Sequence, residues 1–306
     1  MRFFISANIK ENRPLYYLVL TFLVLLLIYW LSSWFFFYNK YGFTYSSIFR
    51  YFFGDPNFPE KISLAQLFED MHVEIFLKAF YLLVLFSLFL LSSFPEKLKI
   101  TFIAISTLSA VTFILSDIFV LYFSPLFIYI KLISFFLFQA FSGMVILLTL
   151  FFLIFMGDNK PTGMSNIKFI IFVFSFFLLL FTIVNFPLFF SKMGFTPESI
   201  KSYYLGNPST FSKPKTLDGM FKIFYPHILS MAVYSLAVAH LLLFTSSKGR
   251  ILIGSSLFLL SFLDNISGFF VRFVFPQIAV IKVIIFLFLQ VVLLYTSLLL
   301  FLNSKT

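Results

Sequence analysis

The residues most able to do chemistry in this sequence are three histidines at the ends of apolar stretches, His72, His227 and His240. Two imidazoles from facing helices can ligate the iron of a b-type haem, as in four-helix membrane cytochromes. If the two halves of the chain pack symmetrically, His72 and His227 would meet near the outer surface. His240 follows His227 by thirteen residues, about 20 Å along a helix, so it would serve a second cofactor at the other leaflet.

The same histidines permit two other interpretations. Together with Glu74, His72 and His227 could hold a divalent metal, because nitrogen and oxygen ligands suit zinc, iron or manganese. The structural alternative is a set of histidines at the membrane surface that hydrogen-bond a backbone carbonyl or a loop. The cofactor, if one binds, is therefore haem b or a divalent metal.

A second set of candidates consists of polar residues inside apolar stretches, where an ionisable side chain costs several kcal/mol unless it is paired or hydrated. Asp117 lies eight residues before Pro125 and Lys131 lies six after it. In a tight helical hairpin the two would meet as an ion pair. A proton relay, a cation site or interhelical hydrogen bonding would explain the remaining members of this set, Asp264, Lys282, Gln139 and Gln290.

Composition excludes several function classes. The chain is 61% hydrophobic and 11% charged, against roughly 25% charged in an ordinary soluble domain. It has no cysteine, which excludes thiolate metal sites and iron–sulfur clusters. The net charge of +10 indicates anchoring to anionic lipid headgroups and not nucleic-acid binding. Without a phosphate-binding glycine loop, nucleophile elbow, zinc-protease or kinase motif, we expect no enzyme acting on its own.

Long apolar segments must position all of these residues. A helix that crosses the bilayer needs about 20 mostly apolar residues, and we predict an all-α, polytopic bundle of about eight such helices. The predicted spans are Leu15 to Phe37, His72 to Leu91, Ile100 to Tyr122, Pro125 to Met156, Ile167 to Phe190, Tyr225 to Phe244, Ile251 to Phe275 and Pro276 to Leu302.

The distribution of cations predicts the orientation. Under the positive-inside rule, both termini lie in the cytoplasm of a bacterial cell and the chain lies in its inner membrane. The cations on that side are Arg2, Lys10, Arg13, Lys97, Lys99, Lys160, Lys168, Lys248 and Arg250. Those on the opposite side are Lys192, Lys201, Lys213, Lys215 and Lys222.

The sequence repeats itself at an offset of 152 residues. The segment KYGFTYSSIFRYFFGDP, from Lys40, recurs as KMGFTPESIKSYYLGNP, from Lys192. We therefore predict two parallel four-helix repeats, residues 1–157 and 158–306, related by an axis along the membrane normal. Each repeat has a long loop, 38–71 or 191–224, in which a short amphipathic helix would pack over the bundle or dock a membrane or periplasmic protein partner.

These loop motifs resemble those of a family of small bacterial inner-membrane proteins, each with a single four-helix unit. That family's pattern is a Gly-x-Thr-Pro segment, a Tyr-Tyr-x-Gly turn, a Lys-containing loop and a span that opens with His-x-His. The second copy offers Gly194, Thr196, Pro197, Tyr203, Tyr204, Gly206, Lys213, Lys215, His227 and His240. The chain departs from the pattern at Glu74, Tyr225 and Ser87, as expected of a tandem fusion whose copies have diverged.

Three functions are compatible with these features. The first is a membrane-embedded accessory or electron-transfer subunit, with haem or a metal near the outer face. The second is a small transporter or channel whose pathway follows the axis between the repeats. The third is a structural membrane protein without a cofactor, whose loops recruit a partner.

Overall fold

The computed structural model describes residues 13–156, 167–243 and 249–303, together with the single positions Ile9, Thr245 and Ser247. The predicted repeat boundary at residues 157 and 158 lies outside the described residues. So do four of the cations used to predict the orientation, Arg2, Lys10, Lys160 and Lys248.

In the part of the chain that the structure describes, eight helices are long and apolar enough to cross a membrane. They are α1 (Arg13–Tyr41), α3 (Leu64–Leu90), α4 (Glu96–Tyr122), α5 (Phe127–Phe155), α6 (Ile167–Met193), α8 (Leu217–Leu242), α9 (Arg250–Phe273) and α10 (Ala279–Asn303). Lipid offers no hydrogen bonds, so a segment of this length satisfies its backbone internally by forming a helix. The prediction of a polytopic all-α membrane protein is confirmed.

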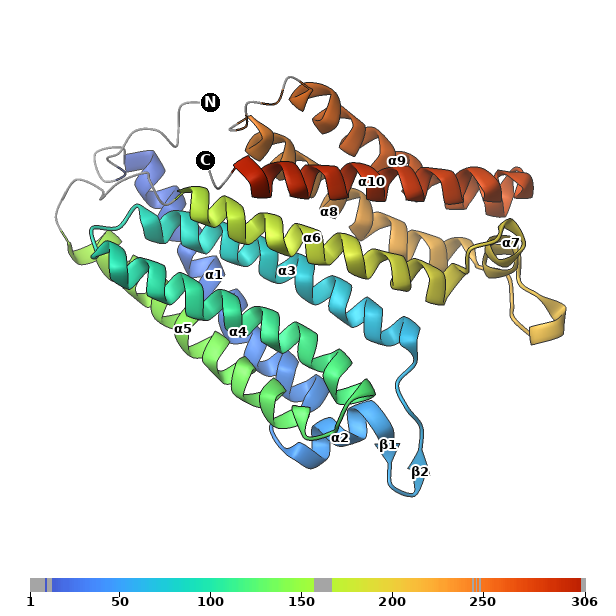
Figure 1. Cartoon of the computed structure of the whole chain (residues 1–306), viewed down its shortest axis with the longest axis horizontal. Helices are drawn as coiled ribbons and strands as arrows, with labels where there is room; N and C mark the ends of the chain where they lie inside the picture. The colour runs from blue at the N-terminus through green and yellow to red at the C-terminus, as the bar shows by residue number, and fades with distance from the viewer. Residues whose placement is uncertain are drawn as a thin grey trace. The chain divides into compact units, whose positions relative to one another are not determined.

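The chain divides into two compact units, Met1–Phe174 and Ser175–Thr306, with the boundary inside α6. In the first unit α4 packs along α5, and α1 and α3 pack against α5. In the second unit α9 packs against both α8 and α10. Figure 1 shows the short helix α2 (Tyr45–Phe53) at one end of the long helices of the first unit. The short helix α7 (Pro197–Leu205) packs on α9 and α10 of the second.

The chain reverses in the same way after α1 and after α6. Gly42 and Gly194 have φ angles of 70° and 69°, a left-handed conformation that costs least at glycine. Their N–H groups donate to Tyr38 O and Phe190 O, both at 2.9 Å, and so end the two helices. The sequence motif shared by the two loops thus has one conformational cause.

Each short helix begins with a capping box. The Thr44 side chain accepts from the backbone N–H of Ser47, whose own side chain accepts from the Thr44 N–H. Thr196 and Ser199 repeat this arrangement before α7. Reciprocal capping satisfies N–H groups of the first turn, which have no carbonyl partner within the helix. This explains how two nine-residue helices form outside the bundle.

The connections that follow the short helices differ in detail. The first contains two antiparallel strands, β1 (Gly54–Asp55) and β2 (Phe58–Pro59). The second contains a 3₁₀ turn, η2 (Pro208–Thr210). A further 3₁₀ turn, η3 (Pro276–Ile278), precedes α10.

The second long helix of each unit begins earlier than the apolar pattern predicts. α3 begins at Leu64 and α8 at Leu217, eight residues before the predicted starts at His72 and Tyr225. Ser63 and Thr216 cap these helices by accepting from Gln66 N and Gly219 N. Capping lets a polar first turn stay helical, so His72 lies about two turns and His227 nearly three turns inside these helices.

Candidate functional site

Six charged side chains from four long helices lie within the first unit. They are Lys40 of α1, Asp70, Glu74 and Lys78 of α3, Asp117 of α4, and Lys131 of α5. Three are cations and three are anions, so the set has no net formal charge. Balance of this kind is required in a low-dielectric interior, where an unpaired charge is very costly.

The most buried member of the set is Lys131, which has no exposed surface. Its amino group forms an ion pair with Asp117 Oδ1 across the hairpin between α4 and α5. The same nitrogen lies 4.4 Å from the ring centroid of Tyr41 and 4.0 Å from that of Phe113. Aromatic faces attract a cation, so the rings of α1 and α4 complete the surroundings of the ammonium group.

A second ion pair ties α1 to α3. Lys40 Nζ lies 2.7 Å from Asp70 Oδ1, and Tyr51 of α2 donates its hydroxyl hydrogen to Asp70 Oδ2. Burial, and then the hydrogen bond to Asp70, raise the pKa of Tyr51 far above its usual range. The Tyr51 hydroxyl therefore stays protonated and remains a donor to the carboxylate.

The third ion pair lies within α3, where Lys78 Nζ pairs with Glu74 Oε2. The Lys78 amino group also lies 4.5 Å from the Phe113 ring centroid, on the same ring that faces Lys131. Glu74 interacts electrostatically with both Lys131 and Lys40 in addition to Lys78. The three ion pairs thus form one network, which we call the first-unit charge network.

The second unit contains a simpler version. Lys282 Nζ lies 3.0 Å from Asp264 Oδ1 and donates to the Asp264 carbonyl at 2.7 Å. Its glutamine, Gln290, accepts through Oε1 from Asn185 Nδ2 at 3.2 Å and is therefore engaged away from Asp264. The matching glutamine of the first unit, Gln139, donates through Nε2 to Ser33 Oγ at 2.6 Å.

The histidines lie in both units and differ in environment. His72 is half-buried in α3 of the first unit, whereas His227 and His240 are exposed on α8 of the second. His227 Nδ1 lies 2.8 Å from Ile223 O, one turn earlier in the same helix. This is the contact that the structural interpretation of the histidines expects.

Within the described residues, no group of three histidine, cysteine, aspartate or glutamate side chains could hold a metal ion. Glu74, which the metal hypothesis joins to His72 and His227, pairs with Lys78. A carboxylate neutralised by a lysine is a poorer ligand than a free one, because the cation must first be displaced.

Sequence reasoning missed half of the first-unit charge network. The predicted span begins at His72, which leaves Asp70 in the loop 38–71, and the apolar pattern does not distinguish Lys78. Lys40 and Tyr51 carried a signal in the repeated segment, where they recur as Lys192 and Tyr203. Ser63 as a helix cap predicts that α3 begins before Asp70 and so brings Asp70 within reach of Lys40 and Tyr51.

Comparison with known proteins gives one match. A family model described as a transmembrane helical domain, Aq_1264_TM, matches two segments of the chain, residues 42–161 and 194–305. No curated protein and no solved structure matches the chain.

Proposed function

We propose that this chain, which belongs to the Aq_1264_TM family of transmembrane helical domains, is a membrane transport protein that passes protons through its first unit. The observation that carries this proposal is the fully buried Lys131, paired with Asp117 inside a bundle of membrane-spanning helices. Ionisable residues in spans are expensive and typically mark proton relays or ion pathways.

Polar side chains continue from this ion pair along α4 and α5. The buried ones are Ser116, Ser109, Ser106 and Lys99 of α4, and Ser134, Gln139, Ser142 and Thr149 of α5. From Lys131 to Thr149 the helix rises by about 27 Å at 1.5 Å per residue, close to the ~30 Å hydrocarbon thickness. Hydrogen-bonding groups therefore recur across almost the whole depth of the unit.

Close helix packing is the alternative explanation for these hydroxyls. Small polar residues let helices approach, and several bond to their own backbone. Ser109 Oγ donates to Ile105 O at 2.7 Å, for example. However, Ser106 Oγ and Gln139 Oε1 are buried without a hydrogen-bond partner among the described residues. An unsatisfied buried polar atom costs free energy that packing alone does not return, which favours a path that exchanges hydrogen bonds with water or a proton.

The proposed transfer step uses only the ion pair. Protonation of the Asp117 carboxylate from the loop side removes the charge that holds Lys131. The Lys131 ammonium then gives one proton to a water molecule in the polar path along α5. Transfer of the proton from Asp117 to the neutral amine restores the ion pair, so one proton has moved and no charge is left behind.

We also propose that the two units arose by duplication of one four-helix module and lie parallel in a bacterial inner membrane with cytoplasmic termini. The two segments matched by the family, residues 42–161 and 194–305, support the duplication. Stacked rings at corresponding places in the two units also support the duplication. The ring centroids of Phe37 and Phe135 lie 3.8 Å apart, and those of Phe189 and Phe286 lie 3.9 Å apart.

Proton flux into proteoliposomes tests the function. The protein is reconstituted with an internal pH-sensitive dye, and a valinomycin-driven potassium gradient supplies the membrane potential. Wild-type protein should acidify the vesicles faster than protein-free vesicles do. The double variant Asp117→Leu/Lys131→Met removes both charges together, so the bundle should fold while flux falls to the protein-free rate.

The control variant is Asp218→Asn, which removes the exposed acid of the Asp218–Lys222 pair and should leave the flux unchanged. The proposal is wrong if wild-type protein conducts no faster than empty vesicles, or if the double variant is folded and conducts as wild type does.

A further inference from the structure

A pocket of about 370 Å³ opens beside α7 in the second unit. Its walls come from the end of α6, from α7 and from the connection that follows α7. The lining residues are Lys192, Met193, Gly194, Ser199, Ser202, Tyr203, Ser212, Lys213 and Lys215. It lies where α6 and α8 leave the apolar segments, at the level expected for lipid headgroups and aqueous solutes.

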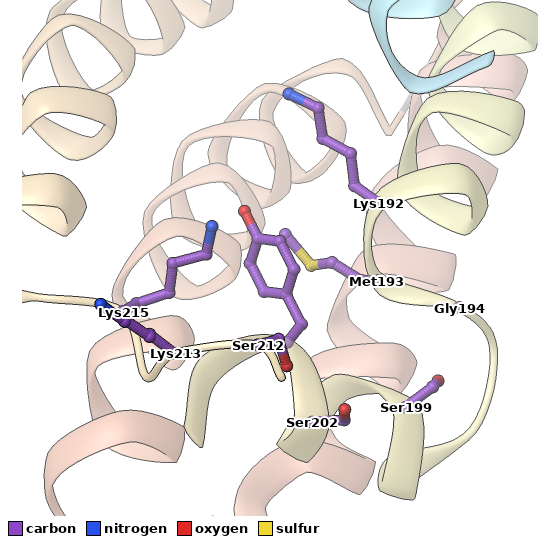
Figure 2. Close-up of a pocket in the computed structure, with 9 residues that line it drawn as sticks. Lys192, Met193, Gly194, Ser199, Ser202, Ser212, Lys213 and Lys215 are labelled. Atoms are coloured by element: carbon purple, nitrogen blue, oxygen red, sulfur yellow. The ribbon is translucent and has the colours of Figure 1, made fainter. Parts of the chain in front are cut away.

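The lining of this pocket carries positive charge only. It includes three lysines, no aspartate and no glutamate, and four hydroxyl groups. Figure 2 shows the amino groups of Lys192 and Lys215 directed into the same open space. Lys215 Nζ lies 4.4 Å from the ring centroid of Tyr203, and Lys213 is exposed beside it. Ammonium groups around one space are the chemistry that binds an oxyanion. The Ser199 hydroxyl already donates to Thr196 O at 2.8 Å.

Both sides of the Lys215 backbone are held in place. Its N–H donates to Tyr204 O of α7 at 3.0 Å, and its carbonyl accepts from Arg272 Nε of α9 at 2.8 Å. The chain before it is closed by Asn207 and Ser212, which exchange two backbone hydrogen bonds of 3.1 Å. The lysine side chains therefore start from a rigid support, which lowers the entropy lost when an anion binds.

The corresponding place in the first unit has different chemistry. Ile62 donates its N–H to Phe52 O at 2.9 Å, as Lys215 does to Tyr204 O, so an isoleucine stands where the pocket has a lysine. Counting from the capping residues Ser63 and Thr216, Ile223 stands at the position of Asp70. The second unit thus has an apolar residue at the place of Asp70 and a lysine at the place of Ile62.

We propose that this pocket binds a phosphate-type anion, either the headgroup of an anionic phospholipid or a free phosphate. Lysine is a common phosphate ligand that acts as a point charge, and partial burial protects Lys192 and Lys215 from full screening by salt. Occupation by the anion neutralises the lining and joins α6, α7 and the following connection. The site is independent of the charge network that the proposed function uses.

Two titrations of the purified full chain in nanodiscs test the site and identify the source of the anion. In phosphatidylcholine nanodiscs, inorganic phosphate is added against chloride at constant ionic strength, and binding is measured by calorimetry. In a second series phosphatidylglycerol replaces part of the phosphatidylcholine, and native mass spectrometry counts the lipids that stay bound. Saturable binding of phosphate indicates a free solute, and retention of phosphatidylglycerol without phosphate binding indicates a headgroup.

The variant Lys213→Gln/Lys215→Gln should weaken whichever binding is seen by at least about tenfold, the loss expected from about 1.4 kcal/mol. Lys215→Arg keeps the charge and should bind within about twofold of wild type. Lys222→Gln, an exposed lysine outside the pocket, is the matched control and should not change binding. The proposal is overturned if neither anion binds more tightly than chloride, or if the double glutamine variant binds as wild type does.

Discussion

Gln139 Nε2 donates a hydrogen bond to Ser33 Oγ at 2.6 Å and so joins α5 to α1 inside the first unit. Trp30 Nε1 adds a bond of 2.9 Å to the Gln139 carbonyl from the same face of α1. In the second unit Gln290 and Asn185 occupy the corresponding positions of α10 and α6 and are also hydrogen-bonded, but here the glutamine accepts and Asn185 donates. A polar clamp at one depth thus recurs between the first and last long helices of each module.

A double-mutant cycle with Ser33→Ala and Gln139→Leu should measure this clamp. We expect a coupling free energy of about 0.6 kcal/mol, and no more than about 1.7 kcal/mol, as for interhelical hydrogen bonds in other membrane proteins. The measurement is unfolding by SDS in mixed micelles. Additive single-variant effects would show that the two side chains do not interact.

Removal of one member of the buried ion pair should destabilise the protein more than removal of both. Asp117→Asn or Lys131→Met alone leaves the partner charge buried, which should lower the unfolding free energy by about 3–5 kcal/mol. The double variant Asp117→Leu/Lys131→Met should recover most of this loss. Thermal unfolding in detergent measures the three variants, and a double variant that is less stable than both single ones would contradict the prediction.

The reversal after α6 requires a residue without a side chain. Gly194→Ala should lower the unfolding free energy by about 1–2 kcal/mol, the cost of a left-handed backbone at an L-residue, because φ is 69° there. Its Cβ would also lie 2.7 Å from the Cβ of Ser199. Gly194→Asn creates the same contact but adopts this backbone more readily, so it should lose less. Equal losses in the two variants would assign the whole cost to the contact.

Single-cysteine labelling should determine the topology. The chain has no cysteine of its own, so each introduced thiol reports alone. Asn57→Cys and Ser209→Cys, in the exposed connections after α2 and α7, should both react with a membrane-impermeant maleimide in intact cells. Glu96→Cys, at the opposite end of α4 from the Asp117 ion pair, should react only after permeabilisation. Labelling of only one of the first two would show that the units are inverted.

The haem hypothesis has its own measurement. If His72 and His227 ligate a b-type haem, the reduced-minus-oxidised spectrum of the purified protein should show Soret and α bands. The bands of this haem should be lost in His72→Ala and His227→Ala, whereas His240→Ala should remove only the contribution of a second haem. A colourless preparation from cells supplied with haem precursor would remove the hypothesis.

Local features of the fold could be predicted from the amino-acid pattern. Hydrocarbon cannot accept backbone hydrogen bonds, so the apolar stretches must be helices wherever they occur. The pairing of Lys131 with Asp117 also followed from spacing, because a tight hairpin brings residues at similar distances from its turn to similar depths. Gly42 and Gly194 recur in the repeated segment, but their left-handed backbone was not predicted from it.

Tertiary structure decided which helices share their charges. Asp70 meets Lys40 and Tyr51 only because α1, α2 and α3 pack together, and no local spacing specifies a contact made across thirty residues of chain. The chemistry around Lys40 and around Lys192 likewise differs because the neighbouring helices present different side chains, Asp70 of α3 in the first unit and Ile223 of α8 in the second. The sequence by itself determined that most of the chain lies in lipid, which segments cross the bilayer, and where the local turns form. These features depend on residues that are close together in the chain. Packing determined the charge partners, since a buried charge is stabilised by whatever lies within a few ångströms of it in space.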